Sequence, residues 1–263
     1  MKRLENKVAV IYGDGTIGAT IAKAFTLEGA RVFLTGRTAA KLDAIAREIQ
    51  FDGGTIETAQ LDALDEQAVE KHMNEVVAKN SKIDISFNAI GIPQQGVQSI
   101  PLIELSAEDF MLPITTYAKS HFITAKAAAK YMVQQGSGVI LNHVPNASRI
   151  STPFSGGLVP AWAAIEALVR SLSVECGKNG VRAVTLLTTA IQETPLIQGL
   201  AQARAKSYGI TSDQFYETMA GQTHRKRLTT LEELTNAAVF LASDEGSAIS
   251  GTILNLTAGI IVN

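Results

Sequence analysis

Three glycines near the start of the chain have the spacing of a phosphate-binding turn. Gly13, Gly15 and Gly18 follow an apolar run at residues 8–12 and lead into helical spacing over residues 17–25. A turn of this kind directs unpaired backbone N–H groups and the positive end of a helix dipole at an anion, usually the pyrophosphate of a dinucleotide. The alternative interpretation is that the glycines only make a tight connection between a strand and a helix.

The elements that must position this turn alternate along the chain. Continuous apolar runs predict buried strands, and apolar residues at helical spacing predict helices between them. The predicted strands lie at residues 8–12, 31–36, 58–60, 83–87, 139–141, 181–187 and 251–256, and the predicted helices at residues 17–25, 40–49, 66–78, 107–132, 161–174 and 231–241. Within the fourth helix, Pro113 predicts a kink or a break.

This order of elements predicts an α/β fold, a Rossmann-like doubly wound parallel sheet of about seven strands with helices on both faces. With 263 residues the chain is most simply a single domain, residues 1–263. Residues 188–226 are polar, rich in Ala, Gln and Thr, and have no clear strand pattern. We therefore expect them to form an insertion over the carboxyl edge of the sheet, where substrates bind in such folds.

The composition excludes several classes of protein. A formal net charge of −2 gives no basic surface for nucleic acid or a membrane, and the one basic cluster, residues 224–227, is interpreted as a solvated loop. Cys176 is the single cysteine, which fits a reducing compartment and a packed thiol. No apolar run reaches the ~18 residues of a membrane span, and the run after Lys2, Arg3 and Lys7 is too short for a secretory signal. We expect a cytoplasmic protein.

Several motifs together resemble those of the short-chain dehydrogenase/reductase family over essentially the whole chain. The turn at residues 12–18 is similar to the family's TGxxxGxG loop, and Asn88-Ala89-Ile90-Gly91 resembles its NNAG segment. Asp62 stands where the family has an adenine-contacting aspartate, and residues 240–259 resemble its C-terminal signature. The resemblance implies an NAD(P)-dependent oxidoreductase. The cofactor-binding residues that it implies are Gly13, Asp14, Gly15, Thr16, Ile17, Gly18, Arg37, Thr38, Asp62, Ala63, Asn88, Ala89, Ile90 and Gly91.

The residues after the second strand favour NADP over NAD. Dinucleotide folds that prefer NAD place a carboxylate there to accept hydrogen bonds from the ribose hydroxyls. Here Gly36, Arg37 and Thr38 occupy the position. A guanidinium suits a 2′-phosphate, and the missing carboxylate removes a repulsion. The alternative is that Arg37 is only an exposed start to the next helix.

The residues that carry the family's chemistry have no counterpart in this sequence. The family uses a Tyr-x-x-x-Lys pair, in which the Tyr transfers a proton, and a preceding Ser that binds the substrate oxygen. When the helix at residues 161–174 is aligned with the family's helix, Leu158 stands at the Tyr position, Trp162 at the Lys position and Pro145 at the Ser position. Tyr117 falls where the family has an Asn. We therefore predict no catalytic residue of the usual kind, and no metal site.

Two segments of the cofactor site also depart from the family pattern. The glycine turn is one residue short, with Tyr12 for a Thr and Thr16 for a Gly, and residues 188–189 are Thr-Thr where the family has Pro-Gly. Near the vacated Ser position, His143 could titrate close to neutral pH, and Tyr117 could present a phenol. The alternative is a hydrogen-bonded histidine and a packed aromatic ring, because neither residue has a lysine at the right spacing.

Two hypotheses for the function remain. The first is an NADP(H)-linked oxidoreductase that acts on a small carbonyl compound or alcohol with a non-standard proton donor. The second is a catalytically silent relative that binds a nucleotide or a partner protein. In either case, the helices around residues 107–132 and 161–175 are apolar enough to predict a homodimer or homotetramer.

Overall fold

A seven-stranded sheet organises the chain, of which the computed structural model describes residues 2–92, 96–150 and 152–262. All strand pairs are parallel, and the strand order is β3-β2-β1-β4-β5-β6-β7. The strands are β1 Val8–Tyr12, β2 Arg31–Gly36, β3 Ile56–Gln60, β4 Ile85–Asn88, β5 Gly138–Pro145, β6 Val181–Thr188 and β7 Thr252–Leu256. The predicted Rossmann-like fold is confirmed.

The order of the strands reverses next to β1. After β1 the chain adds β2 and β3 on one side, then returns to place β4 on the other side of β1, with Tyr12 beside Asn88. In open parallel sheets, ligands bind in the crevice at the carboxyl ends of the strands on either side of such a reversal. The glycine turn after β1 and the segment after β4 meet at this point.

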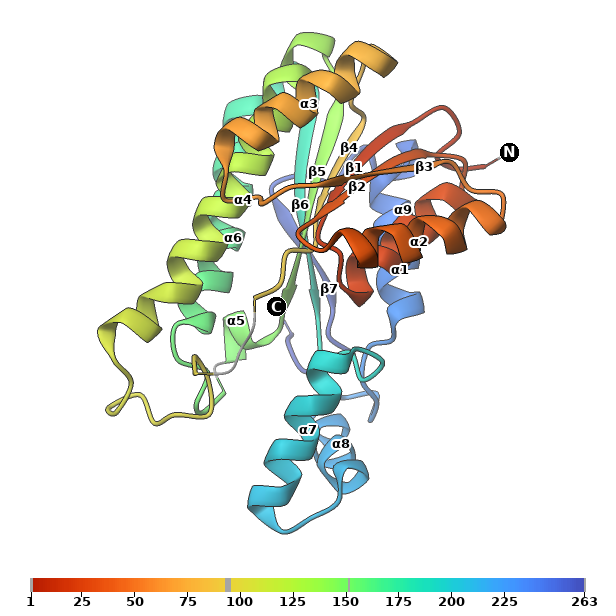
Figure 1. The fold of residues 1–263 in the computed structure, drawn as a ribbon. Helices are drawn as coiled ribbons and strands as arrows, with labels where there is room; N and C mark the ends of the chain where they lie inside the picture. Colours follow the sequence, from red (N-terminus) through yellow and green to blue (C-terminus); the bar gives the residue numbers. More distant parts are fainter. Residues whose placement is uncertain (1, 93–95, 151, 263) are drawn as a thin grey trace.

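Helices cover both faces of the sheet (Figure 1). One face carries α1, α2 and α9, and the other carries α3, α4 and α6. The short α5 follows β5, and α7 and α8 project beyond the carboxyl edge of the sheet. The helices are α1 Thr16–Leu27, α2 Ala39–Phe51, α3 Glu66–Asn80, α4 Ala107–Gln135, α5 Ala147–Ile150, α6 Leu158–Cys176, α7 Pro195–Tyr208, α8 Ser212–Gly221 and α9 Leu231–Ala242, with 3₁₀ turns at Gly177–Asn179 and Asp244–Gly246.

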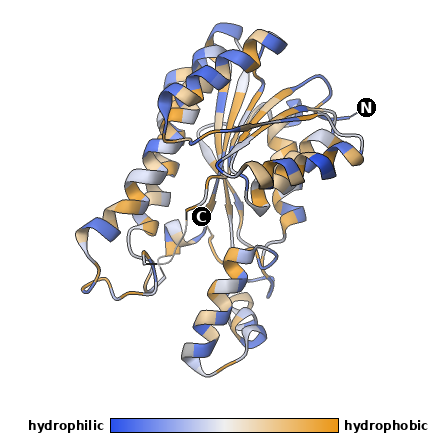
Figure 2. Cartoon of the chain, in the orientation of Figure 1, coloured by the Kyte–Doolittle hydropathy of each residue, from blue (hydrophilic) through white to orange (hydrophobic). Residues whose placement is uncertain are grey.

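The core consists of two apolar layers separated by the sheet. Every residue of β1 is buried, and its side chains alternate between the layer under α1, α2 and α9 and the layer under α3, α4 and α6. Figure 2 shows hydrophilic residues over the visible surface of α3, away from this core. Within the described part of the chain, no helix has the length and hydrophobicity to cross a membrane.

Two details add to the sequence-based expectation. α4 continues without a break through Pro113, which lies early in the helix and is buried. Pro113 is the seventh residue of this 29-residue helix, and its missing N–H removes one helical hydrogen bond, to the carbonyl of Asp109, while the rest of the helix is retained. Residues 188–226 contain two helices, α7 and α8, and the second begins with a capping box at Thr211 and Gln214.

Candidate functional site

A groove of about 610 Å³ runs along the carboxyl ends of β1, β2 and β3. Of the residues predicted to bind the cofactor, all except Gly18 and Asn88 line this groove. The groove also contains residues that the sequence did not single out as cofactor-binding: Tyr12, Thr35, Gly36, Lys41, Leu61, Leu64, Ile92, Thr116, Ser120, Thr194, Pro195 and Leu196. The last three come from the predicted insertion, which has no recognisable motif from which to assign them.

The three glycines of the turn are required for different physical reasons. Gly13 has a φ of +121°, and a Cβ added there would lie 2.4 Å from the carbonyl oxygen of Ala89. At Gly18, an added Cβ would lie 1.9 Å from the carbonyl oxygen of Gly13. These two glycines allow the turn, α1 and the segment after β4 to pack closely. Gly18 therefore shapes the groove without lining it.

Gly15 has no such packing requirement. No protein atom lies within 4 Å of a Cβ added at this position, and its backbone is extended, with a φ of −85°. Gly15 lines the groove and is the N-cap of α1, which has no side-chain cap and no acidic residue in its first turn. The first N–H groups of a helix lack intrahelical partners and favour an anion. The shortened turn therefore leaves space and donors that fit a pyrophosphate.

The corner of the groove at the end of β2 contains charges of both signs. Arg37 and Lys41 line the groove there, and so does Asp14 from the glycine turn. The Oδ2 atom of Asp14 accepts a hydrogen bond of 2.9 Å from the backbone N–H of Thr38, the N-cap of α2. The sequence showed the cation, Arg37, and the absence of a carboxylate at the end of β2. It did not foresee that the glycine turn supplies a carboxylate at the same corner.

Asn88 and Asp62 stabilise backbone next to the groove. Asn88 is buried, its Nδ2 atom donates to Thr124 Oγ1 at 2.8 Å, and its Oδ1 atom accepts from the backbone N–H of Ile90 at 3.2 Å. Asp62 Oδ1 accepts from the N–H of Leu64 at 2.9 Å. Asn88 therefore stabilises the backbone next to the groove and does not itself line the groove.

A second cavity, of about 220 Å³, adjoins the groove. The two share wall residues from the start of α1, the segment after β4 and the start of α7, namely Ile17, Ala89, Ile90, Gly91, Thr194 and Leu196. The remaining wall comes mainly from the end of β5, from α6, α7 and α8, and from residues 189–191. A ligand in the groove can thus extend to the mouth of the cavity.

The residues that the sequence predicts at the family's Tyr, Lys and Ser positions carry no ionisable group. Leu158 has no exposed surface and packs with Val97, Tyr117 and Val144 in a core cluster. Trp162 and Pro145 line the cavity. The aromatic ring of Trp162 therefore lines the cavity at the position predicted for the family's lysine.

Tyr117 and His143 both line this cavity, and both are neutral at pH 7. Burial raises the pKa of the Tyr117 phenol, although the side chain of Trp162 and the backbone of Ile92 hydrogen-bond to it and lower the pKa somewhat. Burial lowers the pKa of His143 to about 4. The Nε2 atom of His143 lies 2.9 Å from Thr188 Oγ1.

The Thr-Thr segment that replaces Pro-Gly is held by side-chain hydrogen bonds. Thr188 Oγ1 donates to the carbonyl of Thr189 at 2.8 Å, and Thr189 Oγ1 donates to Thr229 Oγ1 at 2.9 Å. The N–H of Thr229 donates in turn to Thr189 Oγ1 at 2.7 Å. These bonds join the end of β6 to the loop before α9.

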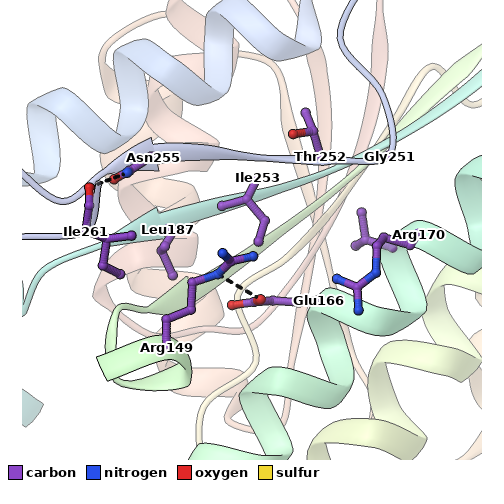
Figure 3. A pocket seen from close by; sticks show the side chains of 10 residues that line it. Arg149, Glu166, Arg170, Leu187, Gly251, Thr252, Ile253, Asn255 and Ile261 are labelled. Atoms are coloured by element: carbon purple, nitrogen blue, oxygen red, sulfur yellow. Dashed lines mark hydrogen bonds and ion pairs between the residues drawn. The ribbon is translucent and has the colours of Figure 1, made fainter. Parts of the chain in front are cut away.

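A third cavity, of about 150 Å³, shares no residue with the other two. It lies between α6 and the edge strand β7 (Figure 3). Arg149 Nε forms an ion pair of 3.2 Å with the buried Glu166, and Ser148 Oγ donates to the same carboxylate at 2.6 Å. None of the predicted cofactor residues lies here.

Comparisons with known proteins assign the chain to a family. The sequence model described as Enoyl-(Acyl carrier protein) reductase matches residues 13–260. The chain is 31% identical over 262 residues to the uncharacterized oxidoreductase YxbG of Bacillus subtilis (strain 168), which covers 99% of this chain and 93% of that protein. The chain belongs to the short-chain dehydrogenase/reductase family of oxidoreductases.

Two further relatives have an activity or a bound ligand in their names. Gluconate 5-dehydrogenase of Gluconobacter oxydans (strain 621H) is 28% identical, over 94% of this chain and 91% of that protein. The crystal structure of a gluconate 5-dehydrogenase from Burkholderia cenocepacia J2315, in complex with NADP and tartrate, is similar with a TM-score of 0.86 and 25% identity. The similarity covers 98% of this chain and 96% of that chain.

Proposed function

We propose that this protein binds NADP(H) in the groove and reduces a small carbonyl compound, or oxidises the corresponding alcohol, in the adjoining cavity. The observation that carries the proposal is the shared wall of groove and cavity, to which α1, the segment after β4 and α7 all contribute. A nicotinamide, when bound, supplies or accepts the hydride. The NADP in the structure of the Burkholderia cenocepacia relative supports the choice of cofactor.

The preference for NADP rests on the charges after β2. Arg37 and Lys41 line the groove where a 2′-phosphate would lie, and guanidinium groups bind phosphate through charge-assisted hydrogen bonds. Asp14 opposes this preference, because its carboxylate lies at the same corner. Two cations against one carboxylate favour the phosphate.

Tyr117 supplies the proton in this proposal. Its oxygen already accepts hydrogen bonds from Trp162 and from the backbone of Ile92, so the remaining capacity of the hydroxyl is to donate. In the reductive direction, the carbonyl carbon gains a hydride, the carbonyl oxygen gains the Tyr117 proton, and solvent returns a proton to the phenolate. The raised pKa makes the phenol a weaker acid and leaves very little phenolate at pH 7 to act as a base, so we expect slow reduction and slower oxidation.

The silent-relative hypothesis has its own supporting observation. Leu158, the residue predicted at the family's Tyr position, is completely buried in a hydrophobic cluster. No lysine lines the cavity among the described residues. A protein that only binds NADP(H) would be consistent with both facts.

One titration separates these possibilities. NADPH and NADH are titrated by calorimetry into the protein and into Arg37→Ala, with Arg47→Ala, an exposed residue on α2 outside the groove, as the control. We expect NADPH to bind more tightly than NADH and Arg37→Ala to weaken NADPH about tenfold, since a hydrogen bond to a charged group contributes about 1.5–3 kcal/mol. Absence of binding by either cofactor contradicts the proposal. Binding without NADPH oxidation across a broad carbonyl panel supports the silent relative.

We also propose that the chain forms a homodimer or homotetramer through α4 and α6. Large apolar side chains are exposed on these helices, with Phe122 50% exposed and Val174 79% exposed. Burial of such residues in an interface is favourable. Light scattering should give a mass that is a multiple of the chain's, and Phe122→Lys should shift the equilibrium toward the monomer. A monomeric wild-type protein at micromolar concentration contradicts this.

A further inference from the structure

The wall of the second cavity that comes from α7 and α8 consists mostly of apolar side chains. Ile197 and Leu200 come from α7, and Phe215 and Met219 come from α8. Both helices project beyond the carboxyl edge of the sheet (Figure 1), so this wall lies outside the two apolar layers that cover the sheet. A ligand that fills the cavity must contact these side chains.

The apolar residues of α7 fall into two sets with different surroundings. Ala201 and Ala205 are buried in a small apolar cluster with Phe215 of α8. Ile197 and Leu200 line the cavity and belong to none of the apolar clusters formed by the described residues. Packing between α7 and α8 therefore accounts for the apolar character of the first set. Contact with an apolar ligand accounts for that of the second.

Several hydroxyls of the cavity wall form hydrogen bonds within the protein. Thr152 Oγ1 and Ser155 Oγ share a hydrogen bond of 2.6 Å, and Thr194 Oγ1 donates to the carbonyl of Ile191 at 2.8 Å. A hydroxyl has one donor, so these bonds reduce what the wall can donate to a ligand. A ligand with several hydroxyl groups would leave some of them without partners when it loses its water, which is unfavourable.

Arg204, which also lines the cavity, connects two of its walls. Its Nη2 atom donates to the carbonyl of Pro153 at 3.5 Å. This bond joins α7 to the segment between α5 and α6, which contributes Thr152 and Ser155 to the cavity. The guanidinium therefore helps to hold the apolar face of α7 at the cavity.

The volume of the cavity limits the size of its ligand. It is about 220 Å³, below the ~300–1,000 Å³ of drug-sized pockets. Apolar cavities of about 150 Å³ in other proteins hold one benzene molecule. The cavity is therefore large enough for one six-membered ring with a small substituent.

We propose that the cavity takes an apolar carbonyl compound of about the size of one six-membered ring, with its hydrocarbon body against α7 and α8. The assignment of this compound as the substrate rests on the proposed function, because the reacting carbonyl must lie near Tyr117 and the mouth shared with the groove. Binding of the compound in the cavity does not depend on that function. Ile197, Leu200 and Met219 then select a hydrocarbon body over a hydroxylated one.

The test uses three ketones built on the same ring: cyclohexanone, tetrahydropyran-4-one and 4-hydroxycyclohexanone. The second has an ether oxygen in place of one CH₂ group, and the third has an added hydroxyl. Their affinities are measured by NMR titration, for the protein alone and for the protein saturated with NADP⁺, which cannot reduce a ketone. We expect cyclohexanone to bind about tenfold more tightly than either polar ketone, because their oxygens lose water against an apolar wall.

Two double variants test the wall itself. Leu200→Asn with Met219→Gln keeps the approximate size of both side chains and makes them polar, so the preference for cyclohexanone should fall to about twofold or less. Leu200→Met with Met219→Leu keeps them apolar and should retain most of the preference. Lys206→Gln, a change at an exposed residue of α7 that does not line the cavity, should leave the preference unchanged.

The outcomes separate this proposal from the proposed function. Equal binding of the three ketones, no binding of any, tighter binding of a polar ketone, or a preference that survives in the polar double variant would overturn the proposal. NADPH is titrated into every variant to verify folding. Absence of NADPH binding by the wild type would overturn the proposed function, while the ketone titrations without cofactor still decide the character of the cavity.

Discussion

The two halves of the carboxyl edge of the sheet, one around β1 and β2 and the other around β5 and α6, differ in the chemistry of their side chains. Around β1 and β2, the glycine turn, the uncapped start of α1 and the cations after β2 fit a dinucleotide. Around β5 and α6, the residues that the sequence predicts at the family's Tyr, Lys and Ser positions are a buried leucine, a tryptophan and a proline. Binding of a cofactor depends mainly on backbone and space, whereas proton transfer depends on particular side chains. The residues for proton transfer can therefore change while cofactor binding is kept.

The largest expected effect is at the glycine turn. In Gly13→Ala, the new Cβ meets the carbonyl oxygen of Ala89 at 2.4 Å and the backbone keeps a φ of +121°. Strain and overpacking together should lower the free energy of unfolding by about 4 kcal/mol or more. Denaturant unfolding measures this.

Gly15→Ala is the matched control, because no protein atom lies within 4 Å of its added Cβ. It should leave the free energy of unfolding almost unchanged and weaken NADPH binding. If Gly15→Ala destabilises the fold as much as Gly13→Ala does, the distinction between packing and ligand-facing glycines is wrong.

The next largest effect is expected in the half of the edge around β5 and α6. Tyr117→Phe removes the proposed proton donor and keeps the ring that packs with Leu158. We expect NADPH oxidation with a carbonyl substrate to fall about 100-fold, the usual contribution of a positioned acid, with the affinity for NADPH unchanged. Steady-state kinetics and calorimetry measure the two quantities. An unchanged rate would assign proton transfer to another group or to water.

A smaller effect is expected on the pH dependence of stability, through two neutral histidines near this half of the edge. Burial lowers the pKa of both His121 and His143 to about 4, below the value of about 6.5 for an unfolded chain. As pH falls from 6.5 toward 4, the unfolded state binds protons that the folded state does not, so stability decreases. At pH 5 the loss relative to pH 7.5 should be ~2 kcal/mol for each histidine.

Urea unfolding at the two pH values checks this. His143→Gln, which can keep a hydrogen bond to Thr188, should remove its share of the pH dependence. The surface variant His224→Gln serves as the comparison, since His224 lies in an exposed turn. A wild-type stability that does not change between pH 7.5 and 5 would contradict the assignment of His121 and His143 as histidines that stay neutral in the folded protein.

The smallest effect is expected on cofactor preference, in the half of the edge around β1 and β2. Asp14→Asn removes the negative charge that opposes a 2′-phosphate and keeps an oxygen to accept from the N–H of Thr38. We expect the ratio of NADPH to NADH affinity to rise about threefold, in line with ~0.7 kcal/mol for one partly screened charge. Competition titrations measure the ratio. A fall in the ratio would mean that Asp14 does not lie near the 2′-phosphate.

Much of the fold could be predicted from the sequence, because buried parallel strands leave continuous apolar runs. β1 and β2 were predicted with their observed limits, and the other strands and the long helices were found with boundaries a few residues off. The helices at residues 195–221 were not predicted. Their apolar residues are sparse, and they pack mainly on each other through a small cluster that includes Ala201, Ala205 and Phe215.

The sequence by itself determined the family and the parallel sheet, and it predicted that the usual Tyr, Lys and Ser are absent, since each of these depends on residue types at a known spacing. Only the tertiary structure decided which glycines serve packing and which faces the groove, because that depends on atoms such as the Ala89 oxygen, distant in sequence. It also brought Asp14 beside Thr38, and Arg204 beside Pro153. Contacts between segments far apart in the chain leave no periodic signal, so charge balance at a site emerges only on folding.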